Sequence, residues 1–599
     1  MRRRDLLKMT ALASCAPLIR GVHAASAPII GAAPLRRVRP SDPSWPDAEQ
    51  WAQLKESVGG HLIEVQPMFA ACGKDPQGPA CLDALKNIRN PYWIADQPAG
   101  TEVSGWLDAW TPMPSAYAIN ARSAPDVAAG IHFARKHHLR LAVKGGAHSY
   151  QGTSNAPDSL LIWTRAMNAV ALHDAFVGKG CEGRAAPVPA VSAGAGAVWA
   201  DLYYAVSVQA GRYVQGGSCT TVGVAGIIQS GGFNWFSKRF GTAASSLLEA
   251  EVVTADGQVR VVNACNEPDL FWALKGGGGG TFGVVTRVTL RTHDLPSFIG
   301  GAGAKIKAQS DEAFRKLITR FIDFYHDHLF NPHWGNNVDF SPDNTLEISL
   351  SSQGLTNAQV AEVWKLFVDW VRSSPAHFSF VSPPGSAAID PHKRSLLTGN
   401  DWIHDPRDGA IPYHVWNRGD QGECGAFWHG YESLWLPASL LRRDRRALLA
   451  DALFAASRHK RVSLHLCKGL AGGSDEARKA ALQTAMNPAV VNAFTLAIIA
   501  DGEGPQYPGM PHPALDLAGA RRDARAIDLA ADELRKIVPH PGSYVSESNY
   551  FNPSWQRAFW GEHYPRLRAI KKRYDPDGLF IVHHGVGSEE WSADGFERL

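Results

Sequence analysis

A histidine in a glycine-rich turn is the first residue of this chain that could do chemistry. His148 stands in Gly145-Gly146-Ala147-His148-Ser149-Tyr150, directly after an apolar run from Leu139 to Val143 that predicts a short buried strand. Because glycine has no Cβ, such a turn lets backbone N–H groups approach a pyrophosphate closely. The functional interpretation is a phosphate-binding turn, and the alternative is an ordinary turn that holds a surface histidine.

The common nucleotide and metal motifs are missing from the sequence. No glycine run forms GxGxxG as a strand-to-helix turn or precedes Lys-Ser/Thr, so neither a Rossmann site nor a P-loop is indicated. No CxxC, CxxCH or HExxH occurs, which removes zinc-ribbon, c-type haem and zincin sites. The adjacent His583 and His584 lack the spacing of one helical face, so we interpret them as packed or exposed histidines and expect no metal.

The N-terminus resembles a twin-arginine export signal. Arg3-Arg4-Asp5-Leu6-Leu7-Lys8 precede an apolar stretch from Met9 to Ile19, and small residues follow from Ala24 to Ala27. The stretch is too short for a membrane span of about 20 residues. We expect the Tat export machinery to move the folded chain, with a bound cofactor, to the periplasm or the outside. The alternatives are a chance basic N-terminus and lipoprotein-type cleavage, which would leave a lipid anchor on Cys15.

The cysteine count singles out one residue. Seven of the 8 cysteines remain once a signal that contains Cys15 is removed, which is an odd number for an oxidising compartment. One cysteine should therefore have another role, and Cys72 with Cys81 are expected to close a small loop. The balance of 60 Lys plus Arg against 57 Asp plus Glu gives no support to a nucleic-acid partner.

Local patterns predict the elements that must position these residues. Ser123-Ala124-Pro125 starts a helix whose apolar positions run to Ala134, and further helices are predicted at 198–210, 311–328 and 358–373. Strands are predicted at 160–163, 282–290, 345–350 and 376–381, and a hairpin at 250–262 turns at Asp256-Gly257. One last helix carries Trp555, Phe559, Leu567 and Ile570 and ends at Asp575-Pro576-Asp577-Gly578.

The length of the chain requires at least two domains, because single cores stop growing at roughly 250–300 residues. Residues 28–111 are rich in proline and tryptophan and predict an irregular arm wrapped on the main body. The irregular part 387–430 is long enough for a binding loop or lid. Several of the 19 tryptophans lie between Asp401 and Trp435, where they line an aromatic pocket for an organic ligand or simply fill a core.

Three separated blocks match one protein family in the right order. The blocks are Val143-Lys144-Gly145-Gly146-Ala147-His148-Ser149-Tyr150-Gln151-Gly152, then 216–226 with Gly231-Gly232, then Asp269-Leu270-Phe271-Trp272-Ala273-Leu274-Lys275 with its glycines. With Tyr544-Val545, Trp560-Gly561 and 571–580, they resemble the berberine-bridge-enzyme-like flavoproteins of the vanillyl-alcohol-oxidase superfamily. The resemblance covers roughly residues 112–295 and 543–590.

This resemblance implies an α+β fold: a PCMH-type FAD-binding domain in two parts, interrupted by a substrate domain of antiparallel sheet covered by helices. The implied divisions are a signal at 1–27, the arm at 28–111, FAD-binding parts at 112–297 and 540–599, and the substrate domain at 298–539. In the family the corresponding histidine and cysteine both bond to the flavin, so His148 and Cys219 would form a double covalent tether to FAD. For Cys219 the alternative is a buried free thiol. The other expected FAD-contacting residues are Gly145, Gly146, Ala147, Ser149, Tyr150, Gly217, Thr221, Val222, Gly223 and Gly226. Six cysteines then remain, enough for up to three disulfides.

The chemistry implied is removal of a hydride from a small alcohol or sugar-like substrate. Such a reaction needs a base for the hydroxyl proton. The family commonly places a tyrosine in Tyr-x-Asn-Tyr, whereas this chain has Tyr544-Val545-Ser546-Glu547. The base is therefore Glu547 or Tyr544, unless both only brace the sheet.

Val222 is a small branched residue at a position that in the family leaves room for oxygen, which favours an oxidase that makes H2O2. The alternatives are a dehydrogenase with another acceptor and a secreted flavin-binding protein without turnover. Flavin bleaching by candidate substrates separates the last of these from an enzyme.

Overall fold

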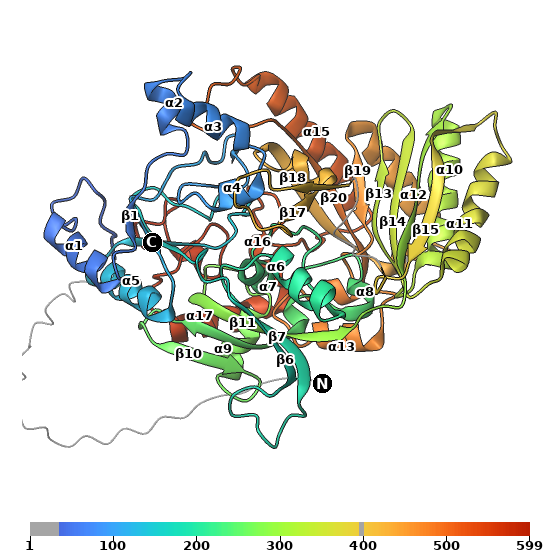
Figure 1. Ribbon diagram of the computed structural model, residues 1–599. Helices are drawn as coiled ribbons and strands as arrows, with labels where there is room; N and C mark the ends of the chain where they lie inside the picture. Colours follow the sequence, from blue (N-terminus) through green and yellow to red (C-terminus); the bar gives the residue numbers. More distant parts are fainter. Residues whose placement is uncertain (1–34, 394–400) are drawn as a thin grey trace, which may run out of the picture. The chain divides into compact units, whose positions relative to one another are not determined.

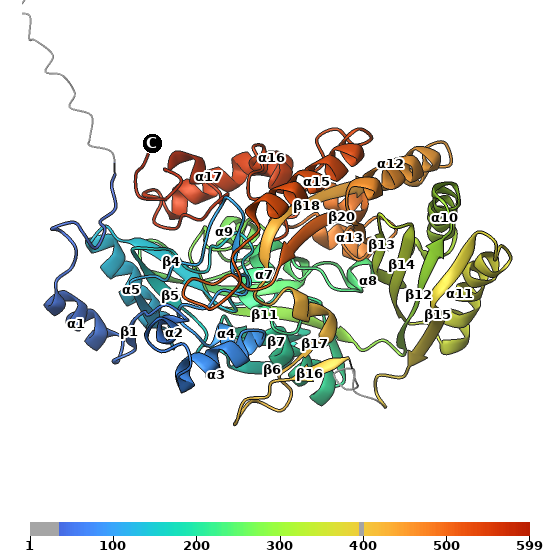
Figure 2. The same ribbon diagram turned by 90° about the horizontal axis from the view of Figure 1, so that it is seen from above.

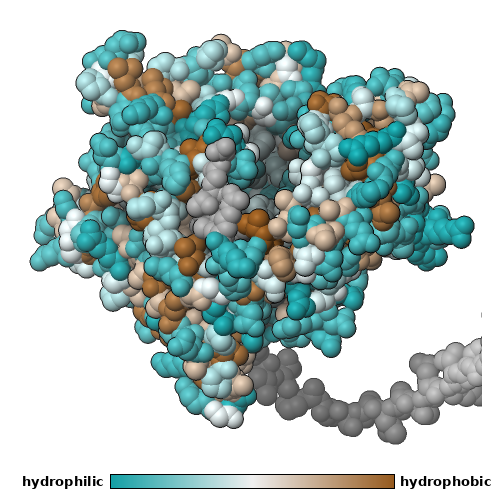
Figure 3. All heavy atoms as spheres, turned by 45° about the vertical axis from the view of Figure 1, so that its right-hand side comes forward, coloured by the Kyte–Doolittle hydropathy of each residue, from teal (hydrophilic) through white to brown (hydrophobic). Residues whose placement is uncertain are grey.

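A computed structural model describes residues 35–393 and 401–599 of the chain. The expected export signal at 1–27, including Cys15, lies outside the described residues. No helix in the described ranges is long and apolar enough to cross a membrane. The face drawn in Figure 3 is mostly hydrophilic, and its apolar residues form small scattered groups.

The turn that carries His148 follows strand β4 of a four-stranded sheet, whose strand order is β1-β3-β5-β4. Its strands are β1 Leu62–Glu64, β3 Tyr117–Asn120, β4 Arg140–Lys144 and β5 Ser159–Trp163. β3 and β4 run parallel to β5, and β1 is antiparallel to β3. Helix α5 (Ala124–Lys136) is present as predicted and begins with a Ser123–Asp126 capping box. It connects β3 to β4 and packs on this sheet.

A second, antiparallel sheet of six strands has the order β10-β9-β11-β7-β6, with β8 paired to β11. Its strands are β6 Val170–Phe176, β7 Val188–Gly194, β8 Arg212–Val214, β9 Leu247–Val253, β10 Val259–Asn263 and β11 Val284–Asp294. Side chains of five helices complete its core: α6 Trp199–Tyr203, α7 Val224–Ser230, α9 Pro268–Leu274, α16 Trp555–Trp560 and α17 Tyr564–Tyr574. The C-terminal segment is thus part of the same core as residues 188–290.

The third sheet has eight strands in the order β15-β12-β14-β13-β19-β20-β18-β2. Its strands are β2 Gly105–Trp106, β12 Ile299–Ala308, β13 Trp334–Phe340, β14 Thr345–Gln353, β15 Phe378–Ile389, β18 Phe427–Pro437, β19 Val462–His465 and β20 Ala493–Glu503. All neighbours are antiparallel except β2 and β18. This confirms the expected antiparallel sheet.

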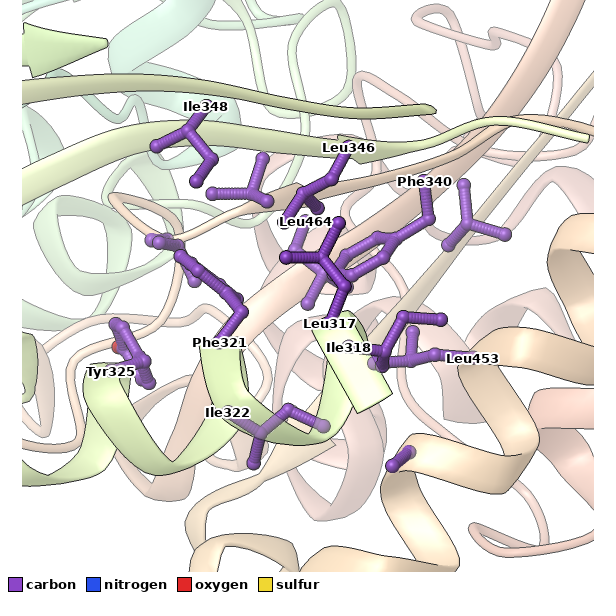
Figure 4. Packing of buried hydrophobic residues seen from close by; sticks show 14 of the residues in the cluster. Leu317, Ile318, Phe321, Ile322, Tyr325, Phe340, Leu346, Ile348, Leu453 and Leu464 are labelled. Atoms are coloured by element: carbon purple, nitrogen blue, oxygen red, sulfur yellow. The ribbon is translucent and has the colours of Figure 1, made fainter. Parts of the chain in front are cut away.

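Helices cover this large sheet and bury its core. They are α10 Asp311–Phe324, α11 Asn357–Arg372, α12 Arg446–His459 and α15 Leu517–Arg535. Figures 1 and 2 both show α10 and α11 on the outer side of strands β12 to β15. A π-helical turn, Tyr325–Leu329, continues α10. Figure 4 shows that one face of this combined helix, with Leu317, Phe321 and Tyr325, points toward strand residues such as Phe340 and Leu346, as helical spacing requires.

The N-terminal arm is more regular than predicted. It contains α1 Ala48–Ser57, α2 Ala70–Lys74, α3 Pro79–Asn87 and α4 Pro91–Ala95, besides β1 and β2. The prediction of an irregular arm was wrong because these helices are short and close to proline or capping residues such as Asp47. Since β1 joins the four-stranded sheet and β2 the eight-stranded one, the arm links two sheets.

Two predicted helices differ in detail. The helix at 198–210 is α6 Trp199–Tyr203 followed by a π-helical turn, Tyr204–Gln209. The single C-terminal helix is divided into α16 and α17 at Gly561, whose φ of 54° ends α16. The remaining short elements are α8 Ser237–Phe240, α13 Asp475–Ala481, α14 Ala489–Asn492 and the paired strands β16 Trp402–His404 and β17 Val415–Asn417.

The cysteines form two disulfides among the described residues. Cys72 bonds to Cys81, as predicted, and Cys181 bonds to Cys265. Cys219, Cys424 and Cys467 are free thiols. The upper limit of three disulfides is therefore not reached, and Cys219 is one of three unbonded cysteines rather than a single odd one.

Candidate active site

A cavity of about 1280 Å³ collects most of the residues that the sequence singled out. The glycine blocks, the C-terminal segment and strands of the eight-stranded sheet all contribute to its wall. Of the predicted site residues, those that line it are Gly145, Gly146, Ala147, His148, Ser149, Tyr150, Cys219, Val222, Gly223, Gly226, Tyr544 and Glu547. Gly217 and Thr221 lie behind this wall. Gly217 packs against Trp199 and Ile227.

The first two glycine blocks contact each other through their backbones. A Cβ on Gly146 would lie 2.6 Å from the backbone nitrogen of Gly223, and a Cβ on Gly223 would lie 2.8 Å from that of Gly146. Side chains at either position would push the two turns apart. Glycine is therefore required here for packing, and this packing brings His148 close to Cys219.

One hydroxyl group contacts both of these residues. Thr221 Oγ1 lies 3.0 Å from Nε2 of His148 and 3.1 Å from Sγ of Cys219. Burial lowers the pKa of His148 to about 4, and burial together with the Asp420 carboxylate raises the pKa of the Cys219 thiol well above its usual value. Both side chains are therefore neutral at neutral pH.

Other glycines leave open space at the cavity floor. A Cβ built on Gly226 would meet no atom within 4 Å, and one on Gly279 would meet only a carbonyl oxygen at 3.9 Å. Both residues line the cavity. Their missing side chains therefore provide room for a ligand beside exposed backbone, rather than room for protein packing.

Tyr544 and Glu547 come from one turn that also lines the cavity. The Tyr544 hydroxyl accepts a hydrogen bond from the backbone N–H of Gly232 at 3.2 Å, and burial raises its pKa. The Glu547 carboxylate pairs with the ammonium of Lys468, while its backbone carbonyl accepts from Ser433. Glu547 therefore brings a carboxyl group paired with Lys468 to the cavity wall, whereas Tyr544 keeps its proton.

The structure adds acidic residues that the sequence did not single out. The Tyr150 hydroxyl donates to Glu423 at 2.8 Å, and burial followed by Asp420 raises the pKa of Glu423 to about 7. Burial raises the pKa of Asp420 to about 6. Both lie within the stretch 387–430, for which the sequence suggested a binding loop or lid, but nothing in their spacing marked them as acids of the site.

Glu102 of the arm is a third such carboxyl group. It is buried, and its Oε2 lies 3.6 Å from Nε2 of His148. Burial raises its pKa to about 8, with Glu423 adding to the effect. The arm was predicted only to wrap the main body, so this contact was missed.

Aromatic side chains form part of the cavity wall, but most of the tryptophans between Asp401 and Trp435 do not. Trp428 and Tyr431 line the cavity and contact the Tyr150 ring at 5.3 and 5.5 Å between centroids. Trp416 and Trp435 do not line the cavity and are buried in core clusters. Trp428 and Tyr431 line the cavity and also belong to the cluster of Trp435, so the pocket and the core interpretations both hold in part.

Two family models match the chain. The model described as FAD binding domain matches residues 115–263, and the one described as Berberine and berberine like matches residues 541–587. The FAD-linked oxidoreductase easE of Arthroderma otae is 30% identical and aligns over 94% of this chain and 91% of its own length. The chain belongs to the berberine-bridge-like FAD-linked oxidoreductases.

Further relatives agree with this FAD-linked oxidoreductase assignment. The VAO-type flavoprotein oxidase VAO615 of Thermothelomyces thermophilus is 29% identical over 99% of both chains. The crystal structure of MtVAO615 from Myceliophthora thermophila C1 superposes with a TM-score of 0.75 at 27% identity, covering 94% of this chain and 99% of its own. Glucooligosaccharide oxidase from Acremonium strictum, described with a 6-S-cysteinyl, 8α-N1-histidyl FAD, shares the fold at 17% identity, a TM-score of 0.60 and coverage of 81% of this chain and 94% of its own.

The residues of this FAD-linked oxidoreductase fit its cofactor. The cavity has glycine turns whose exposed backbone can bind phosphates. At Gly226 and Gly279 it also has open space that larger side chains would occupy. A neutral histidine and a thiol lie together beside one hydroxyl group. His583 and His584 stack on each other at 3.9 Å, His583 stacks on Tyr550, and no group of metal-binding side chains occurs among the described residues.

Proposed function

We propose that this enzyme carries FAD bonded to both His148 and Cys219 and oxidises a small alcohol or sugar-like substrate with O2 as acceptor. The observation that carries the proposal is the single Thr221 hydroxyl in contact with both His148 and Cys219 at one cavity wall. FAD, when bound, accepts the hydride and returns the electrons to O2 as H2O2.

We assign the proton acceptor to Glu547. Loss of hydride from an alcohol carbon requires the hydroxyl proton to move to a base. The Glu547 carboxyl group lines the cavity and pairs with the Lys468 ammonium, whereas Tyr544 receives a hydrogen bond and keeps its proton under neutral conditions. Tyr544 then orients the turn, and Val222 on the cavity wall leaves space for O2.

The polar side chains of the cavity support an alcohol or sugar-like substrate. Asn336, Asn337 and Ser349 come from strands β13 and β14, while Trp428 and Tyr431 come from β18. Hydrogen-bonding groups together with aromatic faces suit a molecule with several hydroxyl groups. We propose accordingly that residues 112–297 and 540–599 hold FAD and that 298–539 shape the substrate side.

Acid denaturation tests the tether. The flavin of the wild type and of His148→Ala or Cys219→Ala should stay with the protein, and the double variant should release it. Cys467→Ala is the matched control, since Cys467 is another free thiol on the same cavity and should keep the flavin. Release of flavin from the wild type would refute the covalent tether.

Anaerobic mixing with panels of alcohols and sugars tests the reaction. For any substrate that bleaches the flavin, Glu547→Gln should slow bleaching by about 10²–10⁴-fold. If Glu423→Gln abolishes bleaching and Glu547→Gln does not, Glu423 is the base. Reoxidation by air with formation of H2O2 supports an oxidase, and stable reduced flavin in air indicates a dehydrogenase.

We propose export by the twin-arginine route from the sequence at 1–27. The disulfides Cys72–Cys81 and Cys181–Cys265 support a destination where thiols are oxidised. Replacement of Arg3 and Arg4 by lysine should keep the protein in the cytoplasm. Export of that variant at the wild-type level would contradict the route.

A further inference from the structure

Glu102 is a buried acid in an unusual position for a residue of the arm. It is 3% exposed, and its Oε2 has no hydrogen-bond partner in the described part of the chain. That oxygen lies 3.6 Å from Nε2 of His148. A buried carboxyl oxygen without a partner costs free energy, so its position beside an imidazole calls for a functional reason.

The backbone of Glu102 is fixed to the His148 turn. Its N–H donates to the carbonyl of Ala147 at 2.9 Å, and its own carbonyl accepts from the N–H of Gly425 at 2.7 Å. The Tyr507 hydroxyl also donates to that carbonyl, at 3.2 Å. The carboxyl group is therefore placed by hydrogen bonds that include the residue directly before His148.

The surroundings of His148 distinguish its two ring nitrogens. Nε2 has the Thr221 hydroxyl at 3.0 Å and the Glu102 carboxyl at 3.6 Å, and Nδ1 has no hydrogen bond within the described residues. A hydrogen on Nε2 leaves the lone pair on Nδ1. Nδ1 is then the nitrogen able to form a new bond.

We propose that Glu102 takes the Nε2 proton of His148 while Nδ1 forms its bond to the 8-methyl carbon of the flavin. This inference rests on the proposed covalent tether. One C–H bond of the methyl group breaks, the N–C bond forms, and the flavin ring takes up two electrons. O2 then takes up these two electrons. Together with two protons, one from the methyl group and one from the imidazole, it forms H2O2.

The chemistry favours Glu102 over Thr221 as the proton acceptor. Alkylation at Nδ1 makes the ring an imidazolium, whose Nε2 proton must go to a group more basic than the ring. A threonine alkoxide is too basic to exist here, so Thr221 orients the ring or passes the proton on. Glu102 can take this proton in its ionised form, and because burial raises its pKa to about 8, that ionised form is a stronger base than an ordinary carboxylate.

The test isolates each tether. In a Cys219→Ala background His148 is the only tether, and Glu102→Gln added there should lower the fraction of acid-stable flavin at least tenfold. In a His148→Ala background Cys219 is the only tether, and Glu102→Gln should leave that fraction unchanged. A merely structural role for Glu102 would lower both fractions equally and would overturn the proposal.

Two further variants complete the experiment, which measures flavin fluorescence of the denatured protein and the mass of the His148 peptide. In the Cys219→Ala background, Glu102→Asp should restore part of the acid-stable flavin, because it keeps a carboxyl group. Glu249→Gln, at another buried glutamate that bonds Lys179 and Asn263, should leave it unchanged. Full retention of acid-stable flavin in Cys219→Ala/Glu102→Gln would refute the role of Glu102 but not the His148 tether. No retention in Cys219→Ala itself refutes the His148 tether and the inference with it.

Discussion

Lys144→Met should loosen the arm that carries Glu102. Lys144 is buried, and its ammonium donates to three backbone carbonyls of the arm: Gln97 at 2.9 Å, Pro98 at 2.5 Å and Gly100 at 3.2 Å. Burial lowers the pKa of Lys144 to about 7, so below that pH its charged form donates hydrogen bonds that contribute about 1.5–3 kcal/mol each. Methionine fills similar volume and removes the cost of burying a charge, which is several kcal/mol. The net loss should be about 3 kcal/mol.

Limited proteolysis measures this loss where it occurs. If cleavage follows the open population of the arm, about 3 kcal/mol raises cleavage near residues 97–104 roughly 100-fold. The melting temperature should fall by only a few degrees, because the whole chain has a large unfolding entropy. Lys136→Met, at an exposed lysine that ends α5, is the control. Equal cleavage of the two variants would show that the ammonium does not hold the arm.

Three further outcomes are expected. Gly226→Val should fold with an unchanged circular dichroism spectrum but lose most of its bound flavin, since its side chain enters the cavity; a normal flavin-to-protein absorbance ratio would contradict this. Burial, and next Arg291, lowers the pKa of His293 to about 4, so the unfolded chain binds more protons between pH 6.5 and 4 and stability falls as pH falls through that window. His293→Gln should remove up to about 3 kcal/mol of this pH dependence in denaturant titrations, and an unchanged slope would show that the histidine is solvated. Replacing Cys181 and Cys265 by serine opens a loop with a sequence separation of 84 and should cost roughly 4 kcal/mol, seen as a lower denaturation midpoint; an unchanged midpoint would mean the unfolded chain gains little freedom.

The sequence predicted those parts of the fold that local patterns determine. Helix α5 was predicted because a capping serine, a proline and apolar positions at helical spacing coincide at one place. The hairpin of β9 and β10 was predicted from Asp256-Gly257, which forms its turn. The glycine blocks indicated a cofactor site through their match to one family, and the structure shows that some of these glycines, such as Gly146 and Gly223, are confined by backbone contact while others, such as Gly226, face open cavity.

Contacts between distant segments were not predictable in this way. Strand β2 has two residues and joins the large sheet only by pairing with β18, more than 300 positions later. Glu102, three residues before β2, meets His148 through backbone bonds to Ala147 and Gly425. No periodicity or motif encodes such a contact, because it depends on where two separate loops pack.

Three carboxyl groups near the proposed tether carry a cost that stability alone does not justify. Burial raises the pKa values of Glu102, Asp420 and Glu423 to about 8, 6 and 7, and neighbouring carboxyl groups add to the rise at Glu102 and Glu423. Since a pKa raised by one is worth about 1.4 kcal/mol, ionising Glu102 in the folded chain costs roughly 5 kcal/mol more than in water. For such groups the folded pKa exceeds the unfolded one, and their ionisation destabilises the fold as pH rises from about 4.5 to 8. Apolar or amide side chains of similar size would avoid this loss. Acids whose pKa values lie near neutrality can exchange protons with a histidine, a thiol or a substrate hydroxyl, and chemistry at this cavity is therefore the reason that we infer for them.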